Sequence, residues 1–383
     1  MSNVYSLPPR PADEPRDPTA NTLSSIEEIL EDLRGGRMVI MLDDEDRENE
    51  GDLIMAAEHV TTEAAAFMIR HTSGIICVPM AAERLAQLDL PQMVPANDEA
   101  YRTAFTVSVD CRYGTTTGVS SSDRAATIRA LADPNAKPQD FARPGHIFPL
   151  RPRKGGVLVR AGHTEAAVDL CTLAGLRPAG VLCELMNDDG TMARRREVEE
   201  FARRHRLRIG TIADLIRYRL RNERSVARVR EQSVQTEFGE FRLCAYQDHV
   251  HGDVHLALVR GRLDGPEAPL VRVHVVDTLR DLLGIRYGSR AWTLRAALAR
   301  IAEAGSGVAV ILAEHPSPAF GTLSPASGGE GQGEGAVLRT YGIGAQILKD
   351  LGVRRMRVLS APKQIHGISA FDLEIEAYVG EDP

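Results

Sequence analysis

The first half of the chain alternates between segments with helical and with strand-like hydrophobic patterns. Apolar residues recur every three or four positions over residues 24–34, and two glycines follow, which predicts a helix. The next segment, RMVIML at 37–42, is almost entirely apolar and predicts a buried strand. This alternation continues to about residue 218 and predicts a mixed α/β layer fold. The same patterns predict helices at 62–70 and 81–88 and from 163 onward, strands at 74–79, 105–110 and 156–160, and turns at 131–145.

The second half is richer in strand-like segments and predicts a second, smaller α/β domain. The arginine-rich stretch YRLRNERSVARVR at 218–230 predicts a solvated helix and linker, with phosphate binding as the alternative. The run SPASGGEGQGEGA is rich in Gly and Ser and predicts a flexible loop. Strands are predicted at 241–246, 255–260, 270–274 and 307–313, and a helix at 293–304. The predicted domains are 22–222 and 234–383, after a disordered lead-in at 1–21.

Composition narrows the class of protein. The length of 383 residues is enough for two domains, and a hydrophobic content of 43% is typical of globular chains. The net charge of −7 argues against nucleic acid as the main partner. We expect no membrane span and no signal peptide, because no apolar run approaches about 18 residues. Five scattered cysteines without a CxxC pair favour free thiols in a reducing cytoplasm.

The stretch LDDEDRENEGD, residues 42–52, contains an unusual density of carboxylates directly after the predicted buried strand. If it stays extended, alternate residues from Asp44 to Asp52 share one face. Asn49 and Gly51 permit a tight turn that brings the backbone close to a ligand. Clusters rich in oxygen suit a hard divalent cation such as Mg²⁺, whereas most charge runs are solvated loops. Composition alone leaves both interpretations open.

The run DDEDRENEGD resembles the signature of 3,4-dihydroxy-2-butanone 4-phosphate synthase, an enzyme of riboflavin biosynthesis. The resemblance implies conversion of D-ribulose 5-phosphate to formate and L-3,4-dihydroxy-2-butanone 4-phosphate, with Mg²⁺ or Mn²⁺ as cofactor. It also implies a homodimer whose active site is completed across the interface. The blocks that carry it cover about residues 22–220 and follow in order: RHTSGIICVPM, TTTGVSSSDRAATIRAL, RPGHIFPL, RAGHTEAAVDL and AGVLCELMNDDGTMAR.

The resemblance also assigns roles to individual residues. Glu48 and His163 look like the protein ligands of Mg²⁺, and the single imidazole makes the site tolerant of Mn²⁺. The phosphate is expected at Thr164 and at the amides of the turn before it, with a basic side chain nearby. The expected substrate contacts are Arg47, Glu48, Asp52, Arg160, Ala161, Gly162, His163, Thr164 and Glu184.

Four further residues are expected to complete the catalytic machinery. His146 follows Pro-Gly, a turn that exposes its ring, and an imidazole suits proton transfer near neutral pH. Glu184 ends an apolar segment, and a partly buried carboxyl there suits acid/base work. Glu50 shapes the acidic cluster or shuttles protons. Cys77 lines the site or is simply a small buried residue.

The second half resembles GTP cyclohydrolase II through LVRVH at 270–274 and LRTYGIGAQIL at 338–348. In that family three cysteines after the histidine bind Zn²⁺, but this chain has Asp277, Gly288 and Arg290 at those positions. Arg339 matches a catalytic arginine, yet its acidic partner is replaced by Val337. We therefore expect no zinc and an inactive cyclohydrolase domain. The alternatives are a bifunctional enzyme, or a binding or regulatory module that contacts another riboflavin-pathway protein.

Overall fold

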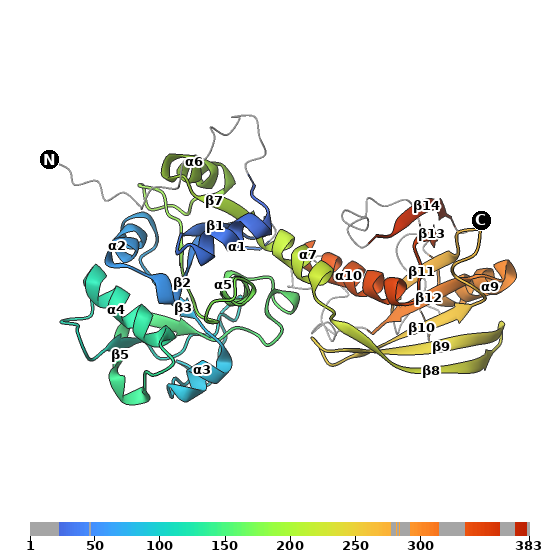
Figure 1. Cartoon of the computed structure of the whole chain (residues 1–383), viewed down its shortest axis with the longest axis horizontal. Coiled ribbons are helices and arrows are strands. Elements are labelled where there is room, and N and C mark those ends of the chain that lie inside the picture. Colours follow the sequence, from blue (N-terminus) through green and yellow to red (C-terminus); the bar gives the residue numbers. More distant parts are fainter. Residues whose placement is uncertain are drawn as a thin grey trace. The chain divides into compact units, whose positions relative to one another are not determined.

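The computed structural model describes residues 23–45, 47–276, 281, 283, 292–313, 334–360 and 372–380, and for 334–337 the backbone alone. The chain divides into two compact units, Met1–Ile216 and Arg217–Pro383, and each builds a mixed sheet of its own (Figure 1). The predicted α/β fold is confirmed. Among the described residues, no helix combines the length and the apolar character that crossing a bilayer requires.

The first unit contains a seven-stranded sheet in the order β4-β5-β3-β6-β2-β1-β7. β1 and β2 pair antiparallel, as do β2 and β6, whereas β1 and β7 run parallel. The strands are β1 (Val39–Leu42), β2 (Gly51–Ala56), β3 (Cys77–Pro79), β4 (Val109–Cys111), β5 (Phe141–Leu150), β6 (Gly180–Glu184) and β7 (Arg208–Thr211). The helices are α1 (Ile26–Arg34), α2 (Thr62–His71), α3 (Ala82–Gln87), α4 (Ser121–Ala132), α5 (His163–Leu173), α6 (Arg195–His205) and α7 (Ile212–Asn222).

Helices cover both faces of this sheet (Figure 1). Side chains of a strand alternate between the two faces, so apolar runs such as Val39–Leu42 can be buried on both sides. Ile40 and Leu53 belong to the core cluster shared with α2, α4 and α6. α1 and α5 pack against the other face. The continuous apolar pattern of β1 is therefore explained by a three-layer arrangement.

Three local predictions for this unit are wrong. Residues 156–160 do not form a strand but include a 3-10 helix, Gly156–Leu158, because Gly155 and Gly156 both have positive φ and the Val157 amide donates to Asp169 (2.8 Å). Residues 141–145 belong to β5, not to a turn. Of the predicted strand at 105–110, only the end forms β4, while Phe105 and Thr106 make isolated bridges.

The second unit has a seven-stranded sheet in the order β14-β13-β11-β12-β10-β9-β8. The predicted linker is wrong after residue 225, because residues 226–236 form a strand, β8, paired antiparallel with β9. Of the loop predicted at 324–336, residues 324–333 lie outside the described residues. Residues 334–336 form the start of a helix instead. The elements are β8 (Val226–Thr236), β9 (Gly239–Asp248), β10 (Val254–Arg260), β11 (Leu270–Val275), α9 (Leu294–Ala304), β12 (Gly307–Leu312), α10 (Glu334–Asp350), β13 (Arg355–Leu359) and β14 (Glu374–Val379).

Candidate functional site

The acidic stretch is a loop and not an extended segment. It joins the antiparallel strands β1 and β2, and Asp43 N–H donates to the Glu50 carbonyl (3.2 Å) across its base. Asn49 has φ +53° and allows the chain to turn back, as the sequence predicts. The predicted alternation from Asp44 to Asp52 on one face is therefore wrong, and Asp46 lies outside the described residues. Gly51 does not turn the chain but packs against Val198, where a Cβ would lie 3.0 Å from Cγ2.

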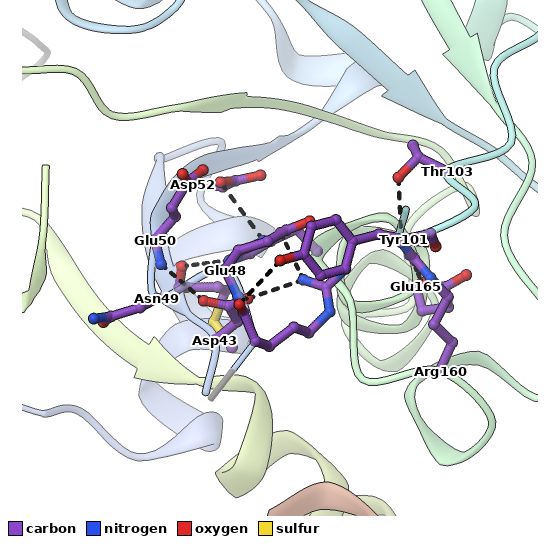
Figure 2. Close-up of polar contacts among 12 residues, drawn as sticks. Asp43, Glu48, Asn49, Glu50, Asp52, Tyr101, Thr103, Arg160 and Glu165 are labelled. Atoms are coloured by element: carbon purple, nitrogen blue, oxygen red, sulfur yellow. Dashed lines mark hydrogen bonds and ion pairs between the residues drawn. The ribbon is translucent and has the colours of Figure 1, made fainter. Parts of the chain in front are cut away.

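One buried carboxylate organises this loop. Asp43 Oδ1 accepts the Glu50 amide (2.8 Å), and its Oδ2 accepts the Glu48 amide (3.1 Å) and Arg47 Nη1 (2.9 Å) (Figure 2). The side chain of Asp43 is fully buried. Arg47 Nη1 also pairs with Glu48 Oε2 at 2.6 Å. Because Asp43 holds the backbone at both Glu48 and Glu50, it fixes where these two carboxylates stand.

His163 meets this loop from the start of α5. Its N-cap is Gly162, which makes no side-chain capping bond. His163 Nε2 lies 3.1 Å from the Met41 carbonyl oxygen, which orients the ring from β1. Its Nδ1 faces Glu48 Oε2 and Asp52 Oδ1, both at 3.7 Å. The helix start predicted at this position is confirmed, and it brings the imidazole to the carboxylates.

The charges in this cluster are strongly coupled. Burial raises the pKa of Asp52 well above its usual value. Burial lowers the pKa of His163, but Asp52 and Glu48 outweigh it and raise that pKa to about 9. Burial likewise raises the pKa of Glu48, but His163 and Arg47 outweigh it and lower that pKa to about 2. Burial and the neighbouring Glu48 raise the pKa of Glu50. Positive charge at this point is therefore essential for the carboxylates to stay ionised.

The donor set fits a hard divalent cation. Ligand atoms of Asp43, Glu48 and His163 all lie within 4.8 Å of one another. The oxygens of Asp43 already accept loop amides, so Glu48 and His163 remain as the side chains with capacity for a metal. Asp52 Oδ1 is buried and has no hydrogen-bond partner among the described residues. Carboxylate oxygens with one imidazole suit Mg²⁺ or Mn²⁺.

The register of the sheet places further predicted residues beside this cluster. Asp52 on β2 lies directly opposite Glu184 on β6, and residues directly opposite each other point to the same face. Cys77 on β3 is opposite Leu182 on β6 and Phe148 on β5, so these side chains point to the same face of the sheet as Glu184.

Glu184 and Cys77 have distinct surroundings on this face of the sheet. Ser73 Oγ donates to Glu184 Oε2 (2.6 Å), and Ser73 N–H donates to the Glu184 carbonyl (2.9 Å), which fixes the carboxylate. Cys77 is 2% exposed, and burial together with Glu184 raises the pKa of its thiol well above the usual value. A thiol in this state is protonated and apolar. The geometry therefore places Cys77 at the wall of the site as a neutral side chain.

Arg160 serves the scaffold of the site with its guanidinium. Its Nη1 donates to Glu165 Oε2 (2.7 Å), and its Nη2 donates to the Tyr101 carbonyl (3.1 Å) and to Thr103 Oγ1 (3.2 Å) (Figure 2). Tyr101 in turn donates its hydroxyl to the Arg47 carbonyl (3.1 Å), and the Arg47 guanidinium lies 5.1 Å from its ring centroid. The loop around Tyr101 thus links the acidic loop to the start of α5.

His146 is paired with an acid on the neighbouring strand. Its Nδ1 lies 2.7 Å from Asp110 Oδ2, and its backbone N–H donates to Asp110 Oδ1 (2.9 Å). The side chain of His146 is 44% exposed, whereas that of Asp110 is 13% exposed. The exposure that the sequence predicts for this ring agrees with the structure.

Sequence patterns did not indicate three of these contacts. Ser73, Tyr101 and Asp110 reach the site from three separate segments. Their partners are 111, 54 and 36 positions away in the chain, respectively. Asp110 stands at the end of a predicted strand, a position that can carry site residues, but nothing in the sequence pairs it with His146. Tyr101 lies in a segment without any hydrophobic period.

In the second unit, the residues that bear on zinc lie mostly beyond what the structure describes. Asp277, Gly288 and Arg290 are outside the described residues, as is the side chain of Val337. His274, on β11, is 4% exposed, and its Nε2 lies 2.8 Å from Asp281 Oδ2. His274, which corresponds to the histidine before the zinc cysteines of the family, is therefore paired through its Nε2 with a carboxylate.

Comparison with known proteins supports both halves of the chain. The family described as 3,4-dihydroxy-2-butanone 4-phosphate synthase matches residues 27–218, and the family described as GTP cyclohydrolase II matches residues 227–380. The 3,4-dihydroxy-2-butanone 4-phosphate synthase of Pseudomonas aeruginosa is 52% identical over 373 residues, 93% of this chain and 99% of its own. Riboflavin biosynthesis protein RibBA of Aquifex aeolicus is 47% identical over 369 residues, covering 92% of this chain and 91% of its own.

Solved structures agree with this assignment. RibBX, a two-domain 3,4-dihydroxy-2-butanone 4-phosphate synthase from A. baumannii, is similar with a TM-score of 0.81 at 43% identity, covering 94% of this chain and all of its own. A 3,4-dihydroxy-2-butanone 4-phosphate synthase in complex with two magnesium ions is similar with a TM-score of 0.52 at 48% identity, covering 52% of this chain and 98% of its own. The family resemblance read from the sequence is confirmed. The chain belongs to the 3,4-dihydroxy-2-butanone 4-phosphate synthase family and carries a GTP cyclohydrolase II domain after the synthase domain.

Proposed function

We propose that the first unit converts D-ribulose 5-phosphate to L-3,4-dihydroxy-2-butanone 4-phosphate and formate. The observation that carries this proposal is the cluster of Glu48, Asp52 and His163, which adjoins Glu184 through the β2–β6 register. The reaction enolises a ketose, removes a hydroxyl, shifts the carbon skeleton and releases one carbon. Those steps require several groups that move protons and a site that stabilises negative charge on oxygen.

Glu48 and His163 would hold a Mg²⁺ or Mn²⁺ ion in this cluster. When bound, the ion supplies Lewis-acid stabilisation of the negative oxygens that form on the ketose. Asp43 keeps Glu48 in place through the Glu48 amide, and the Met41 carbonyl orients His163. Asp52 contributes a buried carboxylate beside the imidazole. Hydrogen bonds from neighbouring groups to the ligand residues set the orientation of metal ligands.

The substrate phosphate is proposed to bind at the start of α5. The first amides of a helix have no partner within the helix, and the Gly162 N-cap adds no side-chain oxygen in front of them. Thr164 is in this first turn, and Ala161 and Gly162 contribute backbone only. The guanidinium of Arg160 is bound by Glu165 and the Tyr101 loop, and that of Arg47 by Asp43 and Glu48, so the amides and the Thr164 hydroxyl carry the proposed phosphate contact.

Proton transfer is proposed for His146, Glu184 and Glu50. His146 exposes its ring and retains a second nitrogen, because Asp110 contacts only Nδ1. Glu184 is held by Ser73, and Glu50 has a raised pKa through burial and Glu48. A carboxyl with a raised pKa holds its proton more readily than a free one, which suits acid/base work.

We propose that a second copy of the chain completes this site. Ile75 is 50% exposed and Val119 is 47% exposed, and Arg124 Nη1 donates to the Gly74 carbonyl (3.2 Å), which joins the two segments that carry them. The Phe148 N–H donates to the Ile76 carbonyl (3.1 Å), so the segment with Ile75 runs alongside the strand that carries His146. Covering these apolar side chains would bring the partner's residues next to His146.

The compartment is proposed from the cysteines. All five are free and buried, as is usual for proteins of a reducing compartment. We therefore propose that the enzyme acts in the cytoplasm. Its proposed substrate there is ribulose 5-phosphate.

The cyclohydrolase domain is proposed to be inactive and to act as a binding or regulatory module. This rests on the sequence, which has Asp277, Gly288 and Arg290 at the positions of three zinc thiolates and Val337 before Arg339. We assign the two domains to 22–222 and 234–383. The first of these domains ends at residue 222, which is also the last residue of α7. Leu220 of α7 contacts Gly342 of α10 within the second unit. The bifunctional reading is the alternative, since the probable bifunctional riboflavin biosynthesis protein RIBA 1 of Oryza sativa is 48% identical over 376 residues.

The first prediction concerns the metal. Glu48→Gln and His163→Ala should each lower formate release at least about 100-fold, because each removes a ligand for an ion whose Lewis acidity is worth several kcal/mol. Both variants should also lose Mn²⁺ binding in calorimetric titrations. Glu45→Gln is the matched control, since Glu45 is an exposed carboxylate of the same loop. Wild-type activity in either ligand variant, or undiminished activity in EDTA, would show that the ligands are assigned wrongly.

The second prediction concerns Tyr101. Tyr101→Phe keeps the ring beside Arg47 but removes the bond from the hydroxyl to the Arg47 carbonyl. One such bond is worth about 1 kcal/mol, so KM for ribulose 5-phosphate should rise roughly 3- to 10-fold, with a further rise in Tyr101→Ala. Tyr113→Phe serves as control because Tyr113 is 69% exposed. An unchanged KM in both Tyr101 variants would contradict a role for this loop in substrate binding.

The third prediction concerns the dimer. Sedimentation should give about twice the chain mass of 41.8 kDa. Ile75→Lys should shift the protein toward monomer and reduce synthase activity, because an interface core excludes unpaired charge. Val229→Lys, at a side chain that is 60% exposed on β8, should change neither property. A wild-type monomer with full activity would rule out the shared site.

The fourth prediction concerns zinc and GTP. Purified protein supplied with GTP, Mg²⁺ and Zn²⁺ should release no formate from GTP, form no diaminopyrimidine and retain no stoichiometric zinc. Opening the guanine ring needs a water that a properly ligated Zn²⁺ ionises near neutral pH, and the thiolates for that site are missing. A GTP cyclohydrolase II assayed in parallel is the positive control. Sustained turnover with about one zinc per chain would restore the bifunctional interpretation.

A further inference from the structure

We propose that Arg194 is a positioning residue that holds the acidic loop from its solvent side and thereby fixes Glu48 for the metal ion. This inference rests on the proposed function, in which Glu48 and His163 hold a divalent cation. It assigns a role to a basic side chain that comes from outside the loop, at the start of α6. The loop contacts described above, made by Asp43, act from the buried side.

The guanidinium of Arg194 binds the carbonyl groups at the turn of the loop. Its Nη1 donates to the carbonyl oxygens of Glu48 and Asn49, both at 2.6 Å. The same nitrogen lies 3.7 Å from Glu50 Oε1. Hydrogen bonds from a charged donor are shorter and stronger than those from a neutral one. A single nitrogen therefore ties two successive peptide groups of the loop, at the point where Asn49 turns the chain back with φ +53°.

Arg194 and Asp43 bind complementary groups of the same short segment. Asp43 accepts the amides of Glu48 and Glu50, whereas Arg194 donates to the carbonyls of Glu48 and Asn49. The side chain of Asp43 is fully buried and that of Arg194 is 48% exposed, so the two act from opposite sides. Because both the N–H and the C=O of Glu48 are bound, its backbone is fixed, and its carboxylate reaches His163 from a defined point.

The backbone of Arg194 is tied to the strands that carry the site. Ala193 N–H donates to the Leu185 carbonyl (3.0 Å), and Leu185 N–H donates to the Gly51 carbonyl (2.9 Å). Arg194 N–H donates to Glu197 Oε2 (3.1 Å) at the start of α6. Gly51 begins β2 directly after the loop, and Leu185 directly follows β6. The loop and the arginine that binds it are therefore anchored to the same pair of strands, which makes the contact a fixed one.

Arg194→Met in the full-length chain tests this directly. Met keeps an unbranched stem and the backbone bond to Glu197 but removes the donors and the charge. We expect the Kd for Mn²⁺ in calorimetric titrations to rise roughly 10-fold, as when a group that orients a metal ligand is lost. In metal-free protein, hydrogen exchange at the amides of residues 48–50 should become faster, because the loop opens more often. Arg195→Met is the matched control, since Arg195 is 51% exposed and paired with Glu199 on the same helix, and it should change neither property.

Two further measurements separate positioning from a direct catalytic role. Arg194→Lys retains a cation with donors and should bind Mn²⁺ at least about threefold more tightly than Arg194→Met. At Mn²⁺ concentrations far above the Kd of the variant, kcat of Arg194→Met should return to within about threefold of the wild type, because the filled site restores the position of Glu48. A group that contacts the substrate would not be replaced in this way.

The outcomes distinguish this inference from the proposed function. Undiminished Mn²⁺ binding in Glu48→Gln would refute the metal assignment itself, whatever Arg194 does. If Glu48→Gln abolishes binding while Arg194→Met and Arg194→Lys both keep the wild-type Kd, the positioning role alone is overturned. A loss of kcat in Arg194→Met that persists at saturating Mn²⁺ would likewise overturn it.

Discussion

The compensation of negative charge around Asp43 is the constraint on which the site depends. The loop between β1 and β2 brings carboxylates together that would repel one another in an open chain. Asp43 is buried at its centre and is stabilised by two backbone amides and by Arg47. This closes the loop and leaves Glu48 facing His163. A loop with the same composition but without a buried centre would be a solvated acidic turn.

The sheet register extends this local order across the molecule. His163 reaches the loop because its Nε2 contacts the Met41 carbonyl, and Met41 is the partner of Asp52 in the β1–β2 pair. Asp52 is in turn the partner of Glu184. Side chains separated by more than 100 positions thus share one row of the sheet, whose spacing is set by backbone hydrogen bonds. Such a row is more rigid than any set of loops, which suits a reaction with several successive proton transfers.

The sequence predicted the layers better than it predicted the contacts. The period of apolar residues located α1, α2 and β1 closely, because burial on one or both faces imposes that period. It failed at residues 156–160, where an apolar GVLV run is a 3-10 helix, since two glycines with positive φ and the Asp169 carboxylate override the strand pattern. The acidic run indicated a cation, but its folding around Asp43 could not be read from charge alone. Ser73, Tyr101 and Asp110 were missed because long-range hydrogen bonds leave no period in the sequence.

The core of the second unit is built from apolar contacts among its strands and α10. Its sheet is built around parallel pairs of β11 with β12 and with β13, and the core cluster that joins α10 to it includes Ile347 and Met356. None of these packing residues depends on a metal, because a sheet of this size buries enough apolar surface to be stable without one. If the second unit lacks the zinc site, as we propose, that loss would therefore cost its core little stability. His274 is buried on β11, where its ring is paired with Asp281. Selection on such a domain can then act on its surface, which is where a binding or regulatory role would be expressed.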